Sequence, residues 1–203
     1  NLCENNIVNN GGYNFGSANS ANNGSINIGE KNICFNGGYN FGISNSSNQG
    51  SINIGENNTA TTASYNIGRY NNTINGYTFG NNNSTNMGFS IGKYNSAIDA
   101  GYAFGDNNTA SNASYSIGKR NNAIIGSFVF GDTNKATNGG FIFGRYNNSF
   151  DGFIFGEYLS AYNGSIAIGN YTTVFYGSIA IGARNYANNG SFILGNTNTA
   201  TKG

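Results

Sequence analysis

A period of twelve or thirteen residues runs through the whole chain and constrains its fold more than any other feature. The clearest copies are two identical hexads, Gly164–Gly169 and Gly177–Gly182, which read G-S-I-A-I-G and begin thirteen residues apart. We number the positions of each unit from the last glycine of its hexad, which we call the origin glycine. The fifteen origins are Gly16, Gly29, Gly42, Gly55, Gly68, Gly80, Gly92, Gly105, Gly118, Gly131, Gly144, Gly156, Gly169, Gly182 and Gly195. A short fixed period predicts a solenoid, in which each turn stacks only on its neighbours.

Two apolar positions recur in every unit. The residue before the origin glycine is Ile, Phe or Leu in all fifteen units, and the third residue before it is Tyr, Ile or Phe in all fifteen. Apolar positions separated by one residue have the period of a β-strand, and frequent Gly and Asn disfavour a helix. We expect these thirty side chains to form the buried stripe of the coil. The residue between them should then point outward.

The rest of each unit has the composition of corners and a second strand. The third residue after the origin glycine is Asn in thirteen of fifteen units, and the fifth is small. Asn and Gly tolerate positive φ angles, and stacked Asn side chains can bond along a column. We predict an all-β parallel β-solenoid of about fifteen turns. Each turn should have two short strands and two corners, one at the origin glycine, and residues 1–203 should form one domain.

Apolar residues also occupy positions that the alternation places outside the coil. The residue between the two apolar positions is Asn in early units and becomes apolar late in the chain. The late residues are Val129, Ile142, Ile154, Ala167, Ala180 and Ile193. A second column, six residues after the origin, contains Phe35, Ile74, Ile98, Ile124, Phe150 and Phe175. An exposed apolar column needs a partner, so we predict that the six late residues form an interface between copies of the coil.

Charged residues and tyrosines gather just after the origin glycine. Twelve of the seventeen charges lie one or two residues past it, and from Lys93 to Glu157 the sign in the first column alternates at every turn. This alternation predicts a ladder of ion pairs on turns stacked in register. The second position holds Tyr70, Tyr94, Tyr146, Tyr158 and Tyr171. These could be ordinary surface tyrosines. As the alternative we predict a receptor-contact stripe with Arg69, Lys93 and Arg145, because Tyr is favoured at interfaces.

The composition argues against catalysis. Only 8% of the residues are charged, the net charge is +1, and histidine is absent. Catalytic triads and zinc-ligand clusters therefore lack their usual members, and the eight acidic residues are scattered. We expect no enzyme activity, no cofactor, no metal site and no nucleic-acid partner, and no apolar run is long enough for a membrane-spanning helix. Cys3 and Cys34 could form a disulfide, or Cys34 could be a buried free thiol.

The hexads resemble a known family. The phrase G-S-I-A-I-G followed by x-x-N-x-A is similar to the head repeats of trimeric autotransporter adhesins, the YadA-like family, whose unit reads S-V-A-I-G-x-x-S-x-A-x-G. The nearest copies are Ser165–Gly169 and Ser178–Gly182, with Asn185 and Ala187 in the places of the family's Ser and Ala. The resemblance covers all fifteen units loosely and about four closely. Tyr and Phe replace the family's small aliphatic residues, so we expect a wider core or one shared between protomers.

The resemblance implies a left-handed, homotrimeric β-roll, part of a longer protein displayed on the outer membrane of a Gram-negative bacterium. Heads of this family bind host matrix proteins or cell-surface receptors such as collagen, fibronectin or CEACAM-type glycoproteins. The expected function is therefore a non-catalytic adhesin head, which binds by multivalent contact and does not itself insert into a membrane. The alternative is a structural β-solenoid, such as the shaft of a viral or phage fibre or of a surface filament.

Overall fold

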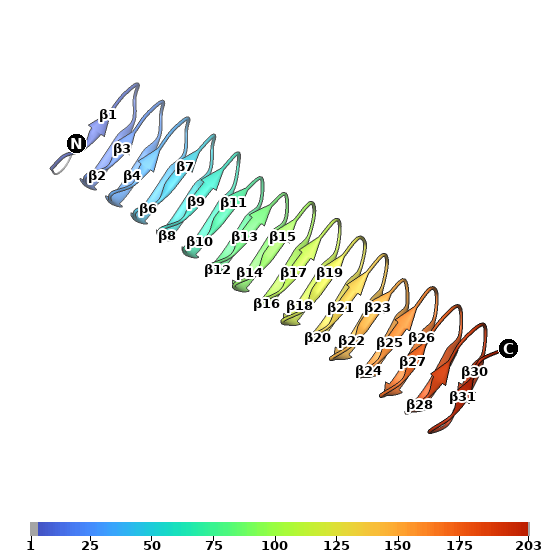
Figure 1. Cartoon of the computed structure of the whole chain (residues 1–203). Helices are drawn as coiled ribbons and strands as arrows, with labels where there is room; N and C mark the ends of the chain where they lie inside the picture. The colour runs from blue at the N-terminus through green and yellow to red at the C-terminus, as the bar shows by residue number, and fades with distance from the viewer. Residues whose placement is uncertain (1–3, 203) are drawn as a thin grey trace. The chain divides into compact units, whose positions relative to one another are not determined.

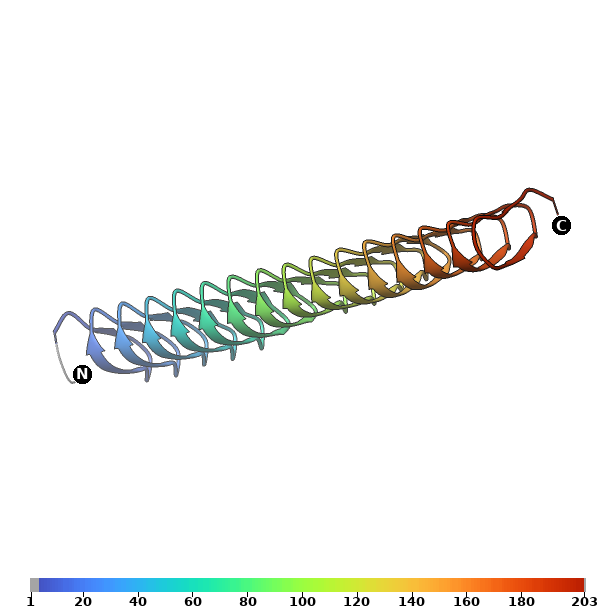
Figure 2. The ribbon, with the colours of Figure 1, turned by 90° about the horizontal axis from the view of Figure 1, so that it is seen from below.

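The computed structural model describes residues 4–202 as strands joined by tight turns, and no helix occurs among them. The chain divides into two compact units, one that ends at Asp99 and one that begins at Ala100. Each unit is a coil of stacked turns, as Figure 1 and, from below, Figure 2 show. The predicted all-β parallel β-solenoid of about fifteen turns is thereby confirmed.

Every complete turn contributes one longer and one shorter strand. In the first unit the longer strands are β2 (Tyr13–Ser17), β4 (Ile26–Glu30), β6 (Tyr39–Ile43), β8 (Ile52–Glu56), β10 (Tyr65–Arg69), β12 (Tyr77–Asn81) and β14 (Phe89–Lys93). The shorter ones are β1 (Ile7–Val8), β3 (Ser20–Ala21), β5 (Ile33–Cys34), β7 (Ser46–Asn48), β9 (Thr59–Thr61), β11 (Asn72–Ile74), β13 (Ser84–Asn86) and β15 (Ser96–Ile98).

The second unit repeats this arrangement. Its longer strands are β16 (Tyr102–Asp106), β18 (Tyr115–Lys119), β20 (Phe128–Asp132), β22 (Phe141–Arg145), β24 (Phe153–Glu157), β26 (Ile166–Asn170), β28 (Ile179–Ala183) and β30 (Phe192–Leu194). Its shorter strands are β17 (Thr109–Ser111), β19 (Asn122–Ile124), β21 (Lys135–Thr137), β23 (Asn148–Phe150), β25 (Ser160–Tyr162), β27 (Thr173–Val174), β29 (Tyr186–Ala187) and β31 (Thr199–Ala200).

Within each unit the even-numbered and odd-numbered strands form two separate parallel sheets. Equivalent residues pair directly, so that Gly131 lies opposite Gly144 and Gly144 opposite Gly156. The shorter spacings do not disturb this register. In the twelve-residue turn after Gly68, Asn72 still pairs with Thr59 and Tyr77 with Tyr65, as expected if the residue is lost at the second corner.

The second corner pairs a left-handed asparagine with a glycine in several turns. Asn23 has a φ of 52° and Gly24 a φ of 73°, and Asn36 and Gly37 repeat the arrangement. The Gly24 N–H donates to the carbonyl of Asn10 at 3.1 Å, and the Gly37 N–H donates to the carbonyl of Asn23 at 3.0 Å. The first corner differs in part from the prediction. The origin glycine belongs to the strand, although its φ is positive (109° at Gly16 and 124° at Gly29), and a second residue of positive φ follows two positions later.

The prediction of which side chains of the longer strands point into the coil is wrong. Val129, Ile142 and Ile154 are completely buried inside the protomer's own coil, and Phe143 and Phe155, which flank them in the chain, are exposed. The same correction applies to the whole predicted interface. Its six members, Val129, Ile142, Ile154, Ala167, Ala180 and Ile193, are all buried within the coil. They therefore belong to the core, and the thirty side chains expected inside lie on the outside of the sheet.

The narrow interior explains this reversal. A strand with alternating faces satisfies the period of two with either face inward, so the space between the two sheets decides. That space is small: a Cβ added to Gly38 would lie 2.8 Å from the sulfur of Cys34, and one added to Gly152 would lie 2.8 Å from the Cβ of Ala161. Tyr and Phe side chains at every turn have no room there. The residue between them is never aromatic, and it fills the interior instead.

The two units fill this interior differently. In the first unit a column of buried asparagines hydrogen-bonds from turn to turn. Its Nδ2 to Oδ1 links are Asn27 to Asn14, Asn40 to Asn27, Asn53 to Asn40 and Asn66 to Asn53, at 2.9–3.0 Å. In the second unit the same column becomes apolar and packs as one hydrophobic cluster that includes Val129, Ile142 and Ile154. The unit with an amide interior depends on hydrogen bonds, whereas the other depends on apolar burial.

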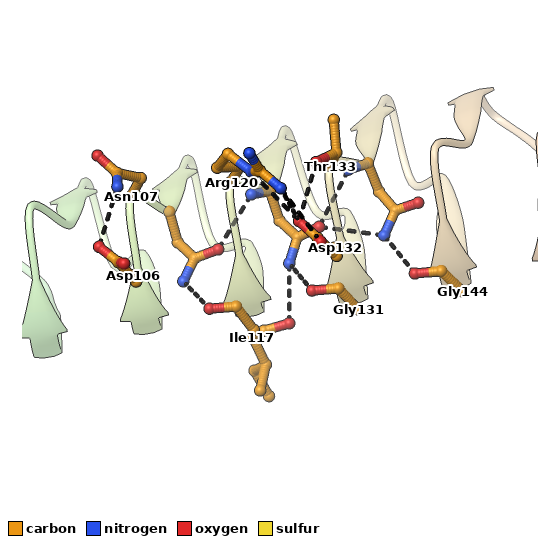
Figure 3. Close-up of polar contacts among 12 residues, drawn as sticks. Asp106, Asn107, Ile117, Arg120, Gly131, Asp132, Thr133 and Gly144 are labelled. Atoms are coloured by element: carbon orange, nitrogen blue, oxygen red, sulfur yellow. Dashed lines mark hydrogen bonds and ion pairs between the residues drawn. The ribbon is translucent and has the colours of Figure 1, made fainter.

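A second asparagine column links the turns beside the origin glycines (Figure 3). The backbone N–H of Asn134 donates to Oδ1 of Asn121 at 3.1 Å, and its Nδ2 donates to the carbonyl of Gly144 at 2.7 Å. Asn121 repeats the pattern toward Gly131 at 2.7 Å. Each amide therefore satisfies backbone groups of both neighbouring turns, which explains why Asn recurs at this position.

The origin glycines should be irreplaceable, unlike the glycines of the second corner. A Cβ on Gly144 would lie 1.8 Å from the carbonyl oxygen of Gly156, whereas one on Gly164 would meet nothing within 4 Å. We expect Gly164→Ala to cost about 1–2 kcal/mol through its left-handed conformation alone. Gly144→Ala should cost clearly more, because the next turn must move away. Urea unfolding measures both, and equal losses would contradict this explanation.

The corrected facing predicts that Ile142 supports the coil itself. Replacing Ile142 by Ala leaves a cavity among buried neighbours, so we expect the free energy of unfolding to fall by about 2–5 kcal/mol. The mass of the native protein in solution should stay unchanged. If the variant had normal stability and an altered native mass, the result would instead place Ile142 at an interface between copies.

Candidate recognition surfaces

The outer side of the even-numbered strands is an uninterrupted apolar surface in each unit. We call it the apolar face. It consists of the residues one and three positions before each origin glycine, thirty large apolar side chains in all, of which Phe155 is 50% and Leu194 70% exposed. Rings stack along it: Phe130 and Phe143 have centroids 4.9 Å apart, and Phe143 and Phe155 have centroids 5.2 Å apart. A surface of this extent is unusual for a protein that remains alone in water.

A groove runs along one edge of the apolar face in the second unit. Its lining includes the glycines Gly131, Gly144 and Gly156, between the rings of Phe143 and Phe155 and the charged side chains of Asp132, Arg145 and Glu157. Its volume is about 430 Å³. Since no side chain projects from the origin glycines, the groove follows from the repeat itself.

The charged column beside this groove stacks in register, as predicted. Lys119 lies opposite both Asp106 and Asp132, and Arg145 lies opposite both Asp132 and Glu157. Nε of Arg145 lies 2.7 Å from Oε1 of Glu157. Asp132 pairs instead with Arg120, a residue of the second position, at 3.2 Å (Figure 3). These side chains are exposed, so the column favours correct register more than it adds stability.

The surroundings of Asp132 lower the pKa of its carboxyl group. A hydrogen bond from the hydroxyl of Thr133 is the largest cause, and the guanidinium of Arg120 adds to it. A carboxyl whose pKa is lower in the folded state stabilises the fold above its unfolded pKa. That contribution is lost as the pH falls through the folded value, and it is small because the group is exposed.

Three of the predicted tyrosines form one stack, which we call the tyrosine ladder. The rings of Tyr146 and Tyr158 have centroids 4.9 Å apart, and those of Tyr158 and Tyr171 have centroids 4.8 Å apart, with interplanar angles of 9° and 3°. All three residues are exposed and have positive φ angles of 56°, 54° and 51°. The ladder stands at the first corner, where the chain leaves the even-numbered sheet.

A second stack lies on the outer side of the odd-numbered strands in the same turns. Phe150 pairs in register with Tyr162, and the rings of Tyr162 and Phe175 stack with centroids 4.9 Å apart. We call Phe150, Tyr162 and Phe175 the strand ladder. Tyr186 of the following turn tilts against Phe175 at 5.9 Å. Nδ2 of Asn148 donates to the hydroxyl of Tyr162 at 3.0 Å and holds that ring in place.

The structure brings together only part of the predicted receptor-contact set. Arg145 precedes Tyr146 at the ladder, whereas Arg69, Tyr70, Lys93 and Tyr94 belong to the first unit. Those two tyrosines do not occupy consecutive turns, because Asn82 fills the position between them. The predicted exposure of the five tyrosines is confirmed, and their contact with a receptor stays a prediction.

Sequence reasoning missed two features. It placed the apolar face inside the coil, because strand alternation does not reveal which side is inner. It also overlooked Tyr162, because only apolar residues were counted in the column that holds Phe150 and Phe175. The signal was present: from Phe150 to Phe175, three consecutive turns carry a ring at the same position.

Cys34 is a buried thiol whose sulfur lies 2.8 Å from the hydroxyl oxygen of Ser47, and burial raises its pKa. Cys3 lies outside the described residues. Within residues 4–202, no three His, Cys, Asp or Glu side chains gather as a metal site would require. Nor does this part of the chain contain a helix that could cross a lipid bilayer.

Comparison with known proteins adds little. No family model matches the chain, and no curated protein matches it. One solved structure found by the comparison is the polySia-specific acetyltransferase NeuO, at 11% identity over 97% of this chain and 79% of that one. The TM-score is 0.15, which is too low to support an argument about fold or function.

The burial of Cys34 predicts an unreactive thiol in the native protein. Because the raised pKa keeps the sulfur protonated and the coil covers it, iodoacetamide at pH 8 should modify Cys34 only after denaturation. Peptide mass mapping separates this cysteine from Cys3. Rapid modification of Cys34 under native conditions would show that the coil opens locally around β5.

Proposed function

We propose that this chain is the head of a homotrimeric surface adhesin of the YadA-like class, a left-handed β-roll that acts by non-catalytic, multivalent contact. In this proposal it is displayed from the outer membrane of a Gram-negative bacterium and binds a host receptor or matrix protein. The resemblance of Ser165–Gly169 and Ser178–Gly182 to the head repeats of that family supports the assignment.

The apolar face is the observation that carries the proposal. All thirty of its positions are large and apolar, and many of these side chains remain more than a third exposed in a single chain. Exposed apolar surface of this extent favours association, because covering it removes it from water at about 25 cal/mol per Å². The face itself requires only that copies pack together. The number three comes from the family resemblance.

Assembly through the apolar face leaves the odd-numbered sheets available for contact. In each copy these strands form the other sheet of the coil, so covering one sheet need not cover the other. Three equivalent surfaces on one particle raise the avidity of a weak site through effective concentration. A structural shaft could use the same apolar face for assembly. What separates the two functions is attachment to host cells or matrix, which a shaft does not require.

Self-association through the apolar face, with the number of copies taken from the family resemblance, predicts a native mass near three times 21.3 kDa. Replacing Phe143 and Phe155 by Asp should dissociate the assembly, because carboxylates would be buried against apolar side chains. Light scattering measures the mass. The matched control is Phe150→Asp. Phe150 lies on the other sheet and is 41% exposed, which is close to the 40% of Phe143. This control should leave the mass unchanged. A monomeric native protein would refute the proposed assembly.

A further inference from the structure

The aromatic rings outside the apolar face are concentrated in one place. The apolar face repeats at every turn, as a scaffold for assembly would. The outer side of the odd-numbered strands is instead mostly Ser, Thr and Asn, for example Thr109 and Ser111 in β17. Its long run of rings is the strand ladder, which occupies the same three turns as the tyrosine ladder. A local departure from a uniform repeat indicates a specific role for these turns. We call the two ladders together the aromatic patch.

The tyrosine ladder occupies a backbone conformation that disfavours tyrosine. Asn82 and Asn107 fill the equivalent position in other turns with φ angles of 56° and 55°, and asparagine tolerates this region better than an aromatic residue. Three consecutive turns nevertheless carry tyrosine there. Residues held in costly conformations concentrate at functional sites. Lys31, Tyr70 and Arg120, however, hold the same conformation in other turns, with φ angles of 57°, 54° and 51°, so the strain belongs to the repeat. What sets these turns apart is the run of three stacked tyrosines.

Stacking prepares the patch for contact. The three rings of the tyrosine ladder lie nearly parallel, as do those of Tyr162 and Phe175 in the strand ladder, so these rings fix one another's rotamers and lose little entropy on binding. The inner ring faces are covered by their neighbours, and the patch presents ring edges and hydroxyl groups. Between the ladders lie the small polar side chains of Asn148, Ser160 and Thr173. Tyrosine combined with serine and asparagine is also the composition of antibody binding sites.

The charges around the patch limit the class of molecule that it can bind. Arg145 and Glu157 stand beside the tyrosine ladder and are paired with each other, at 2.7 Å. The ladders themselves carry no charge, and the residues next to them mix the cations Lys135 and Arg184 with the acid Asp151. Positive potential for a polyanion or an anionic membrane is therefore not concentrated here. A sugar ring would need a free aromatic face for stacking, and the inner faces are covered. We propose that the aromatic patch docks a folded protein through an uncharged, hydrogen-bonding surface.

This inference rests on the proposed function and names the surface that performs it. The strand ladder lies on β23 and β25 and directly after β27, which belong to the odd-numbered sheet of the second unit, whereas the tyrosine ladder stands at the first corner. The strand ladder therefore lies on a different sheet from the apolar face, and the tyrosine ladder stands at the corner between the two sheets. Assembly through that face and docking through the patch are compatible within one chain.

The test replaces the patch with residues that the chain itself uses at the same positions. One variant carries Tyr146→Asn, Tyr158→Asn and Tyr171→Asn, which suit the left-handed corner, and a second carries Phe150→Thr, Tyr162→Thr and Phe175→Thr. The control carries Tyr70→Asn, Tyr94→Asn, Ile74→Thr and Ile98→Thr in the first unit. Circular dichroism and native mass establish that each variant folds and assembles. The probes are cultured epithelial cells and surfaces coated with collagen or fibronectin.

We expect each patch variant to attach at least tenfold less than the unaltered protein, and the control to attach normally. Attachment to cells should disappear after trypsin treatment and survive glycosidase treatment, added heparin and 0.5 M salt. Normal attachment by folded patch variants would overturn the docking site and leave the proposed adhesin function standing. Loss of attachment with glycosidase or heparin would overturn the choice of a protein partner. If the unaltered protein attaches to no probe, the proposed function fails and the docking site with it.

Discussion

Stacking each turn directly on the one before, without a change of register, is the constraint on which the other features depend. Parallel strands lie about 4.8 Å apart, so a residue type repeated once per turn becomes a continuous column. The bare glycine column, the two asparagine columns and the aromatic ladders all arise in this way. The stacking tolerates no Cβ at the origin, where the carbonyl of Gly156 lies 1.8 Å from the place of a Cβ on Gly144.

The same constraint makes the coil thin and reverses the usual distribution of side chains between interior and surface. Two sheets this close enclose mainly small residues, so the large apolar side chains lie outside, where an ordinary globular protein would bury them. The interior is then satisfied either by amide hydrogen bonds, as at Asn40, or by aliphatic packing, as at Ile142. The column on the inner side of each longer strand therefore stabilises the single chain, and the columns on its outer side favour association between chains.

The period and the in-register ladder could be predicted from the sequence because they depend on spacing alone. The alternation of charge from Lys119 to Glu157 already indicated the register that the strand pairing has. The facing of the strands could not be predicted from hydrophobicity, because Ile142 and Phe143 are both apolar and only the width of the interior separates them. The aromatic patch could be predicted only in part: Tyr146, Tyr158 and Tyr171 were singled out and Tyr162 was not, and the stacking of the rings depends on side-chain packing that spacing does not give.

The second corner bears on how this protein ages chemically. A chain with so many Asn-Gly steps should lose side-chain ammonia readily, because the glycine nitrogen attacks the asparagine amide and closes a succinimide ring. In the folded coil the N–H of Gly24 is held by the carbonyl of Asn10 at 3.1 Å, and the side chain of Asn23 donates to Asn36 at 2.9 Å. Both reacting groups are thus engaged with neighbouring turns. The repeat that builds the coil also protects its most labile bonds for as long as it stays folded.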